Sequence, residues 1–200
     1  MYMPIPHRNT FGKESFTYWE NFLTDDELDY LRDHPLWDQK EAAQVGGSND
    51  GGVVNSNIRR SGVSWLTPDN DNLLIFNKIT SVVAEVNRRH FHLDIDGCYE
   101  PAQLTYYDAS MAGEYDWHVD GCPSDAGVPR KLSMSLLLNE PSEFIGGDFE
   151  VMSSSATPTT LSQRRGRAWF FPSYLLHKVS PVVSGHRKSL VLWVGGPQFR

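Results

Sequence analysis

The runs LSMSLLL (132–138), RAWFF (167–171) and SLVLWVG (189–195) decide the fold class of this chain. Each is a short segment of strand-forming residues bounded by Gly, Pro or Asn, a pattern typical of β-strands. Four further runs of the same kind are QLTYY (103–107), WHVD (117–120), GDFEVM (147–152) and HKVSPVV (177–183). Closely spaced strands favour a sandwich or barrel, so we predict a mainly β core over about residues 96–200.

The helical signals all precede this β-rich block. Thr24 to Glu27 form a capping box, whose Thr and Glu side chains can satisfy backbone N–H groups at a helix start, and Leu28 and Leu31 follow as the buried stripe. A second helix is predicted over about residues 72–89. Its apolar stripe comprises Leu73, Phe76, Val83 and Val86.

The order of these elements predicts their arrangement. Helices that come before the strands cannot connect parallel strands, so the helical support, about residues 20–95, should pack outside an antiparallel core. A chain of 200 residues suits one domain, predicted over residues 1–200. The loop QVGGSNDGGVVNSN (44–57) between the helices is predicted to be mobile, as a surface loop or, less favoured, a lid.

Composition excludes several classes of partner and compartment. The net charge of -7 opposes binding to a phosphate backbone, so we expect no nucleic-acid partner. Cys98 and Cys122 form no CxxC pair, which argues against a disulfide framework and favours a reducing, cytoplasmic location. We also expect no membrane association, because no apolar run approaches 18 residues and the N-terminus lacks a leader pattern.

The segment YDWHVD (115–120) offers two metal ligands. Side chains alternate faces along a strand, so His118 and Asp120 should point to the same side. His177, after another β-rich run, is the candidate third ligand. Two His and one carboxylate make the facial triad of non-haem Fe(II) oxygenases, which leaves coordination positions open. A zinc hydrolase with the same ligands is the alternative, as is a surface role for this HxD triplet.

Arg187, ten residues after His177, raises the weight of the oxygenase interpretation. Its planar guanidinium is suited to two-point binding of a carboxylate in an apolar pocket. Strand alternation places Ser189, Val191 and Trp193 on the same face. We therefore predict that Arg187 binds the distal carboxylate of 2-oxoglutarate, with a surface arginine as the alternative.

Residues 103–196 resemble the 2-oxoglutarate- and Fe(II)-dependent dioxygenases of the prolyl 4-hydroxylase-like group, nearest the bacterial and phage-like branch. The resemblance rests on His118-Val119-Asp120, on Gly146 to Phe149, on Gly166 to Phe171, and on the block HxVxPVxxGxR from His177 to Arg187, followed by Trp193. It implies a double-stranded β-helix, or jelly roll, with helices flanking one sheet.

The resemblance also implies residue roles and cofactors. His118, Asp120 and His177 look like the iron ligands, and Arg187 like the 2-oxoglutarate clamp. Tyr107 looks like a second ligand of that carboxylate, with Tyr106 as a rival, and Trp193 would share its pocket. Fe(II), 2-oxoglutarate and ascorbate are the implied cofactors. Arg60, in the segment NIRRS (57–61), is similar to an arginine near the substrate entrance of this group, although a solvated basic pair is the plainer interpretation.

The implied activity is hydroxylation with release of succinate and CO₂, with a prolyl residue of a protein or peptide as the expected substrate. A free amino acid or other small molecule is the enzymatic alternative, and a cupin-like binding module without activity is the non-enzymatic one. Asp116, Ser173 and Tyr174 are candidates for orienting the ligands. Gly146-Gly147 is predicted to form a tight turn, and Trp117 and Trp169 to pack or line a groove.

Overall fold

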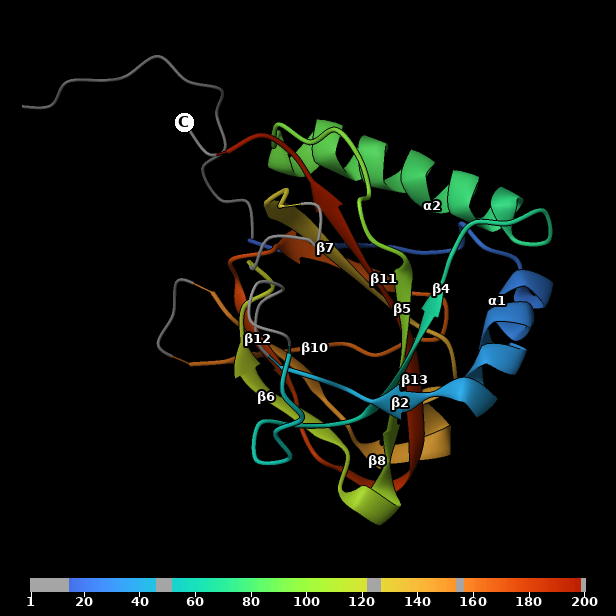
Figure 1. Ribbon diagram of the computed structural model, residues 1–200. Coiled ribbons are helices and arrows are strands. Elements are labelled where there is room, and N and C mark those ends of the chain that lie inside the picture. Colours follow the sequence, from blue (N-terminus) through green and yellow to red (C-terminus); the bar gives the residue numbers. More distant parts are fainter. Residues whose placement is uncertain (1–14, 46–51, 122–126, 154–156, 199–200) are drawn as a thin grey trace, which may run out of the picture.

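Two antiparallel β-sheets face each other, and the two α-helices cover the outer face of the larger one (Figure 1). The computed structural model describes residues 15–45, 52–121, 127–153 and 157–198. Within these residues every strand pair is antiparallel. The predicted mainly β fold, a jelly roll with flanking helices, is therefore confirmed.

The larger sheet has eight strands in the order β1-β11-β7-β13-β5-β4-β2, with β8 added along β13. These are β1 (Thr17–Trp19), β2 (Glu41–Ala42), β4 (Gly62–Leu66), β5 (Ala102–Asp108), β7 (Arg130–Leu137), β8 (Phe144–Gly146), β11 (Ala168–Pro172) and β13 (Val182–Gly195). The smaller sheet has five strands in the order β10-β9-β12-β6-β3. These are β3 (Arg59–Arg60), β6 (Glu114–His118), β9 (Phe149–Met152), β10 (Thr159–Leu161) and β12 (Leu176–Val179).

The helices begin where the sequence places them. Helix α1 (Asp25–Arg32) has the predicted capping box, in which the Thr24 side chain accepts from the Glu27 N–H and the Glu27 carboxylate from the Thr24 N–H. Helix α2 (Leu73–Val86) continues into a π-helical turn, η2 (Asn87–Phe91). Three 3-10 turns complete the list: η1 (Pro35–Gln39), η3 (Ala109–Met111) and η4 (Pro141–Glu143).

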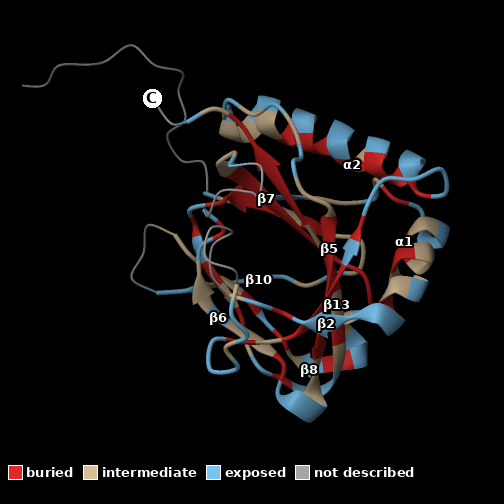
Figure 2. Cartoon of the chain, in the orientation of Figure 1, coloured by how far each residue is buried: buried red, intermediate tan, exposed pale blue. Residues whose placement is uncertain are grey.

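A first core cluster joins the helices to the larger sheet. It contains Leu28 and Leu31 of α1, Ile79 of α2 and Leu104 of β5, all buried. The predicted stripe of α2 is correct except for Leu73, which is 47% exposed. Ile75, Ile79 and Val82 complete the buried face instead. Figure 2 shows the buried faces of both helices turned toward the sheet.

A second core cluster lies between the two sheets. It includes Phe149 and Val151 of β9, Leu161 of β10, Phe171 of β11 and Tyr107 of β5. Since its members come from both sheets, this cluster sets the distance between the two sheets and fills part of the space between them.

The first half of the chain contains short strands in addition to the expected helices. Strands β2 and β4 join the larger sheet and β3 the smaller one, although these short segments lie in the region assigned to helices. Strand β1, just before that region, also joins the larger sheet. The run 177–183 also divides, because Ser180 and Pro181 separate β12 from the 14-residue strand β13. The loop at 44–57 lies partly outside the described residues, and the single domain stays a prediction.

No described helix combines the length and the apolar character that crossing a bilayer requires.

Candidate active site

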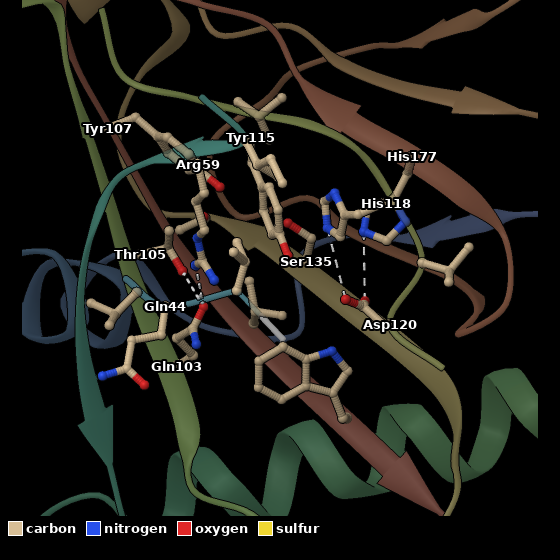
Figure 3. A pocket seen from close by; sticks show the side chains of 18 of the residues that line it. Gln44, Arg59, Gln103, Thr105, Tyr107, Tyr115, His118, Asp120, Ser135 and His177 are labelled. Carbon is tan, nitrogen blue, oxygen red and sulfur yellow. Dashed lines mark hydrogen bonds and ion pairs between the residues drawn. The ribbon is translucent and has the colours of Figure 1, made fainter. Parts of the chain in front are cut away.

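A cavity of about 720 Å³ opens between the two sheets (Figure 3). Its walls come from β2, β4, β5, β7, β11 and β13 of the larger sheet and from β3, β6, β9 and β12 of the smaller one. His118, Asp120, His177 and Arg187 all line it. The predicted ligands and the predicted clamp therefore share one cavity.

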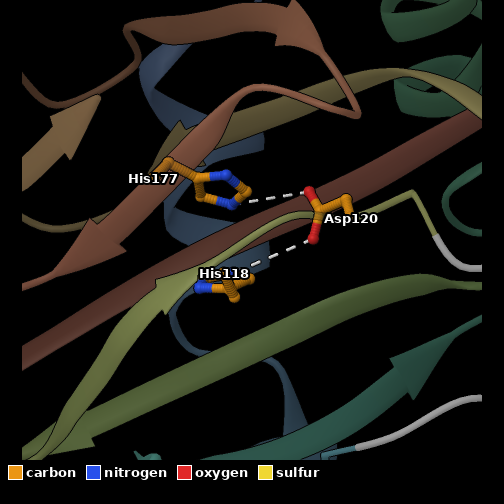
Figure 4. Close-up of side chains that lie close together, drawn as sticks. All are labelled: His118, Asp120 and His177. Carbon is orange, nitrogen blue, oxygen red and sulfur yellow. Dashed lines mark ion pairs between the residues drawn. The ribbon is translucent and has the colours of Figure 1, made fainter. Parts of the chain in front are cut away.

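His118, Asp120 and His177 form the only cluster of three potential metal ligands among the described residues (Figure 4). Their donor atoms lie within 4.8 Å of one another. Asp120 Oδ1 is 3.8 Å from His118 Nε2, and Asp120 Oδ2 is 3.6 Å from His177 Nε2. His118 at the end of β6 is the register partner of His177 in β12, so the sheet itself brings the two imidazoles together.

Backbone carbonyls hold both imidazole rings with Nε2 toward the cluster. His118 Nδ1 lies 2.7 Å from the Asp116 carbonyl, and His177 Nδ1 lies 2.8 Å from the Leu175 carbonyl. A carbonyl only accepts, so each Nδ1 carries the proton and each Nε2 presents a lone pair. The ring of Tyr115 stacks on His118 at 3.4 Å between centroids, which fixes the plane of that imidazole.

Asp120 is positioned by hydrogen bonds and not by strand alternation. Strand β6 ends at His118, and the Asp120 N–H donates to the Ser173 carbonyl at 2.8 Å. The Ser133 hydroxyl donates to Asp120 Oδ2 at 2.8 Å and lies 3.0 Å from the Ser173 hydroxyl. The expectation that Asp120 faces the same side as His118 is correct, but the reason lies in the turn between β11 and β12.

The electrostatics of the cluster favour the ligand forms of its groups. Burial, reinforced by the neighbouring His177, lowers the pKa of His118 to about 3, so its imidazole is neutral at pH 7. Burial by itself would raise the pKa of Asp120. The two imidazoles and the Ser133 hydroxyl outweigh that effect and lower the pKa, so the carboxylate is ionised.

Arg187 lies in β13 as a buried cation, 3% exposed. Its guanidinium donates to Ser189 Oγ at 3.1 Å and to Gln163 Oε1 at 3.4 Å, and it has no ion-pair partner among the described residues. Burial lowers its pKa. Because a buried charge is costly without a counter-charge, this position fits an anionic ligand. Ser189, Val191 and Trp193 also line the cavity, as the alternation along the strand predicts.

The register of the larger sheet separates Tyr107 from its rival Tyr106. Tyr107 is the partner of Arg187 across β5 and β13, lines the cavity, and has the guanidinium of Arg187 at 5.8 Å from its ring. Tyr106 points to the opposite face, where its hydroxyl donates to Asp108 and its ring stacks on His186. His186 accordingly lies away from the cavity, as expected.

Trp193 carries an unsatisfied donor on the cavity wall. The residue is 7% exposed, and its Nε1 is the only buried side-chain polar atom without a hydrogen-bond partner in the described residues. The guanidinium of Arg130 packs on its ring at 3.9 Å, and Trp65 packs beside it at 6.3 Å between centroids. This wall therefore offers a flat aromatic surface, and the Trp193 N–H is near enough to Asp120 to help lower the pKa of that carboxylate.

The structure places Arg59, and not the predicted Arg60, in the cavity. Arg60 lies outside it, where its guanidinium pairs with Glu114 at 2.7 Å and donates to the carbonyls of Met111 and Ser56. The reason is strand alternation, which turns neighbouring residues of β3 to opposite sides. Arg59 packs on the Tyr115 ring at 4.5 Å from the centroid and is 8% exposed.

The remaining predicted site residues also divide between those at the cavity and those away from it. Trp117 lines the cavity, whereas Trp169 does not and packs against Phe16 and Tyr18 beside the second core cluster. Asp116 and Ser173 contact the predicted ligands His118 and Asp120 through their backbone carbonyls, and Tyr174 is exposed. Ser133 was not predicted from the sequence. The available signal was the alternation along β7, which turns Ser133 to the same inward side as Ser135.

Gly146-Gly147 forms the predicted turn. Gly146 has φ +78° and Gly147 φ +62°, a region that favours glycine. A Cβ on Gly146 would lie 2.2 Å from the Pro181 carbonyl oxygen, so the turn leaves no room for a side chain.

The donor set fits Fe(II). Two imidazoles and one carboxylate on one side of a point leave the cavity side open for further ligands, and carboxylate with imidazole suits this ion. The buried cation at Arg187 adds an anion site in the same cavity, which a zinc hydrolase has no need of.

Comparison with known proteins agrees with this geometry. Residues 102–195 match the model of the 2OG-Fe(II) oxygenase superfamily. A PKHD-type hydroxylase from Colwellia psychrerythraea is 30% identical over 89 residues, which cover 44% of this chain and 40% of that protein. The chain thus spans less than half the length of that curated relative.

Two solved structures share the fold. A prolyl-4-hydroxylase from Pseudomonas putida superposes with a TM-score of 0.71 at 18% identity, covering 92% of this chain and 94% of that one. A prolyl hydroxylase from Trichoplax adhaerens, in complex with a peptide fragment of the hypoxia inducible factor oxygen degradation domain, also gives 0.71, at 19% identity, covering 94% and 86%. The predicted resemblance is confirmed, and at these identities the solved structures show the fold alone.

Proposed function

We propose that the protein is an Fe(II)- and 2-oxoglutarate-dependent hydroxylase. The match of residues 102–195 to the model of the 2OG-Fe(II) oxygenase superfamily supports this proposal. The reaction converts 2-oxoglutarate and O₂ to succinate and CO₂ and places one oxygen atom on the substrate. The buried, unpaired cation of Arg187 in the cavity of the His-Asp-His cluster carries this proposal.

His118, Asp120 and His177 would hold the iron. Fe(II), when bound with 2-oxoglutarate, supplies O₂ activation and the oxidising power for hydroxylation. The chain contributes the geometry: both Nδ1–H groups are tied to carbonyls, and Asp120 is tied to Ser133 and to the backbone of Ser173. These contacts hold three donors on one side and cost no reorganisation when the metal enters.

Arg187 and Tyr107 would bind the distal carboxylate of 2-oxoglutarate. A guanidinium offers two parallel N–H donors to a carboxylate, and the Tyr107 hydroxyl lies on the same wall. Desolvation strengthens this pairing, because both residues are buried. Phe149 and Phe171 line the cavity beside His177 and exclude water from the space between clamp and cluster.

The proposed substrate is a prolyl residue of a protein or peptide. Support comes from the prolyl hydroxylases of the same fold, one of which is in complex with a peptide. A free amino acid or another small molecule is the second candidate, because a cavity of about 720 Å³ has room for either beside a dicarboxylate. Ascorbate as a reductant stays a prediction.

Succinate formation tests the activity. Anaerobically purified protein is given Fe(II) and 2-oxoglutarate, O₂ is admitted, and succinate is measured for the wild type, His118→Ala, Arg187→Ala and His186→Ala. We expect succinate from the wild type and from His186→Ala, which lies outside the cavity, none from His118→Ala, and a raised requirement for 2-oxoglutarate in Arg187→Ala.

Binding measurements separate the alternatives. Wild-type protein that binds neither Fe(II) nor 2-oxoglutarate would contradict the proposal and favour a zinc hydrolase or a binding module. Bound Fe(II) and 2-oxoglutarate without succinate would show that turnover requires the substrate itself.

A further inference from the structure

Arg59 is a second buried cation in the cavity. Its Nε donates to Ser61 Oγ at 2.8 Å and its Nη2 to Gln103 Oε1 at 2.8 Å, and both acceptors are neutral. No described carboxylate lies within ion-pair distance of it. Burying a charge beside neutral groups alone is costly, so Arg59, like Arg187, lacks the anion that its position calls for.

The carboxylates of the cavity are engaged elsewhere. Asp120 accepts from Ser133 and faces the two imidazoles. Glu100 accepts two hydrogen bonds from Arg130, and Glu41 is exposed at the edge of the cavity. The counter-charge of Arg59 must therefore come from a ligand.

Gln103 adds a second donor to the same wall. Its Oε1 accepts from Arg59 and, at 3.1 Å, from the Thr105 hydroxyl, which assigns that atom as oxygen and leaves the amide Nε2 for the cavity. Gln103 is buried and lines the cavity, and no described group accepts from its Nε2. Figure 3 shows Arg59, Gln103 and Thr105 grouped on the wall away from Asp120.

Gln103 lies apart from the clamp along the strands, while the Arg59 guanidinium is near enough to Tyr107 to interact with it electrostatically. Arg187 faces Tyr107, whereas Val191 faces Gln103, four residues further along β5 and β13. Four residues of strand span roughly 13 Å. On the other side Arg59 packs on Tyr115, which stacks on His118, so one aromatic ring separates its guanidinium from a metal ligand.

We infer that Arg59 and Gln103 form a second carboxylate site, which binds a free carboxylate of the substrate close to the hydroxylated carbon. This inference rests on the proposed function and narrows its substrate class. For a prolyl substrate it selects the free amino acid or a C-terminal prolyl residue over a residue inside a chain.

Binding of acids and their amides tests the site directly. Protein loaded with Mn(II), which does not support the redox reaction, and saturated with 2-oxoglutarate is titrated at constant ionic strength. Binding is read as the rise in Tm with ligand concentration. The probe pairs are acetate and acetamide, L-proline and L-prolinamide, and N-acetylglycyl-L-proline and its C-terminal amide.

We expect each acid to bind at least about tenfold more tightly than its amide, because a hydrogen bond to a charged group exceeds a neutral one by that margin. Preference for L-proline alone would identify the free amino acid, and preference for the dipeptide acid a C-terminal residue. Equal binding of acids and amides would overturn the inference.

Two variants and a control distinguish loss of the carboxylate site from loss of the folded structure. Arg59→Met should reduce the preference for acids to about one. Gln103→Glu supplies Arg59 with an internal carboxylate, so the ligand-free Tm should hold or rise while the preference for acids is lost. Arg60→Met removes the neighbouring charge outside the cavity and should keep the preference, which also tests the predicted role of Arg60. Retained preference in Gln103→Glu would contradict the site.

The outcomes separate this inference from the proposed function. If Mn(II) and 2-oxoglutarate do not raise the Tm, the proposed function fails, while the preference for acids, compared between the wild type and Arg59→Met, still reports on Arg59. If acetate is preferred over acetamide but neither prolyl acid binds, the carboxylate site stands and the prolyl substrate is wrong.

Discussion

At the scale of single residues, the cluster of His118, Asp120 and His177 depends on groups outside it. Ser133 donates to Asp120 Oδ2 and holds the carboxylate that faces both imidazoles. We expect Ser133→Ala to weaken Fe(II) binding about 10- to 100-fold, because the carboxylate loses the partner that orients it. The measurement is an anaerobic Fe(II) titration of the purified variant.

Ser64→Ala is the matched control for this prediction. Ser64 is also a buried serine of the larger sheet, but its hydroxyl donates to the Leu36 carbonyl, outside the cavity. Both variants should lose about 1 kcal/mol of stability. Equal Fe(II) affinity in the two variants would mean that Ser133 has only a structural role.

His118 predicts a pH dependence of stability in the metal-free protein. Its pKa is about 3 in the folded protein against 6.5 for an ordinary histidine, so below pH 6.5 the unfolded chain takes up a proton that the folded protein does not. Stability should therefore fall as the pH falls from 6.5 toward 3. Between pH 7 and pH 5 the loss from this group is about 2 kcal/mol.

Urea unfolding at pH 7 and pH 5 in the presence of a chelator measures this loss. His118→Phe keeps a ring stacked on Tyr115 and removes the titrating group, so its stability should change by about 2 kcal/mol less than that of the wild type over the same interval. The same pH dependence in both proteins would rule out a buried, neutral His118.

The sequence predicts the site residues that lie in or beside recognisable β-rich runs. His118, Asp120, His177 and Arg187 stand on or beside long runs with clear patterns, and the structure brings them to one cavity. Arg59 was not predicted, because in a strand of two residues nothing in the sequence indicates which arginine faces inward.

At the scale of elements, the turn between β8 and β9 connects the two sheets next to the clamp. Gly146 has φ +78°, and a Cβ there would lie 2.2 Å from the Pro181 carbonyl oxygen. Gly127 has φ +73° with nothing within 4 Å of its Cβ position. Comparing alanine at the two positions separates backbone strain from steric conflict.

Gly127→Ala should cost about 1 to 2 kcal/mol, the strain of a left-handed backbone, and lower the Tm by roughly 2 to 4 °C per kcal/mol. Gly146→Ala should lower the Tm by at least about twice as much, because the Pro181 carbonyl must also move. Calorimetry of both variants measures the difference. Equal Tm values would show that the turn adjusts freely.

Element prediction succeeded where local signals suffice. The capping box at Thr24 satisfies backbone donors within one turn, and the long runs at 132–138 and 189–195 each form strands. Strands β1 and β3 have three and two residues and are defined by partners far away, β11 and β6. Their own sequence contains no equivalent signal.

At the scale of the whole molecule, residues 1–200 are proposed to form one domain with two core clusters. Ile79 belongs to the cluster under the helices and Leu161 to the cluster between the sheets. In one domain, Ile79→Ala and Leu161→Ala should each cost about 2 to 5 kcal/mol and lower the same single transition.

Far-UV and near-UV circular dichroism during thermal unfolding distinguish the outcomes. Coincident transitions in the wild type and in both variants are expected. Two transitions, each sensitive to one substitution, would instead indicate two independently unfolding units.

The proposed iron ligands and the proposed clamp stand on different layers of the molecule. His118 and His177 belong to the smaller sheet and Arg187 to the larger one, and Phe149 and Phe171 pack between them. Facing sheets lie about 10 Å apart, a distance that core side chains set. The hydrophobic side chains between the sheets thereby determine how long a dicarboxylate must be to reach from the metal to the guanidinium. Discrimination against shorter and longer keto acids then depends on residues that form no polar contact with the keto acid.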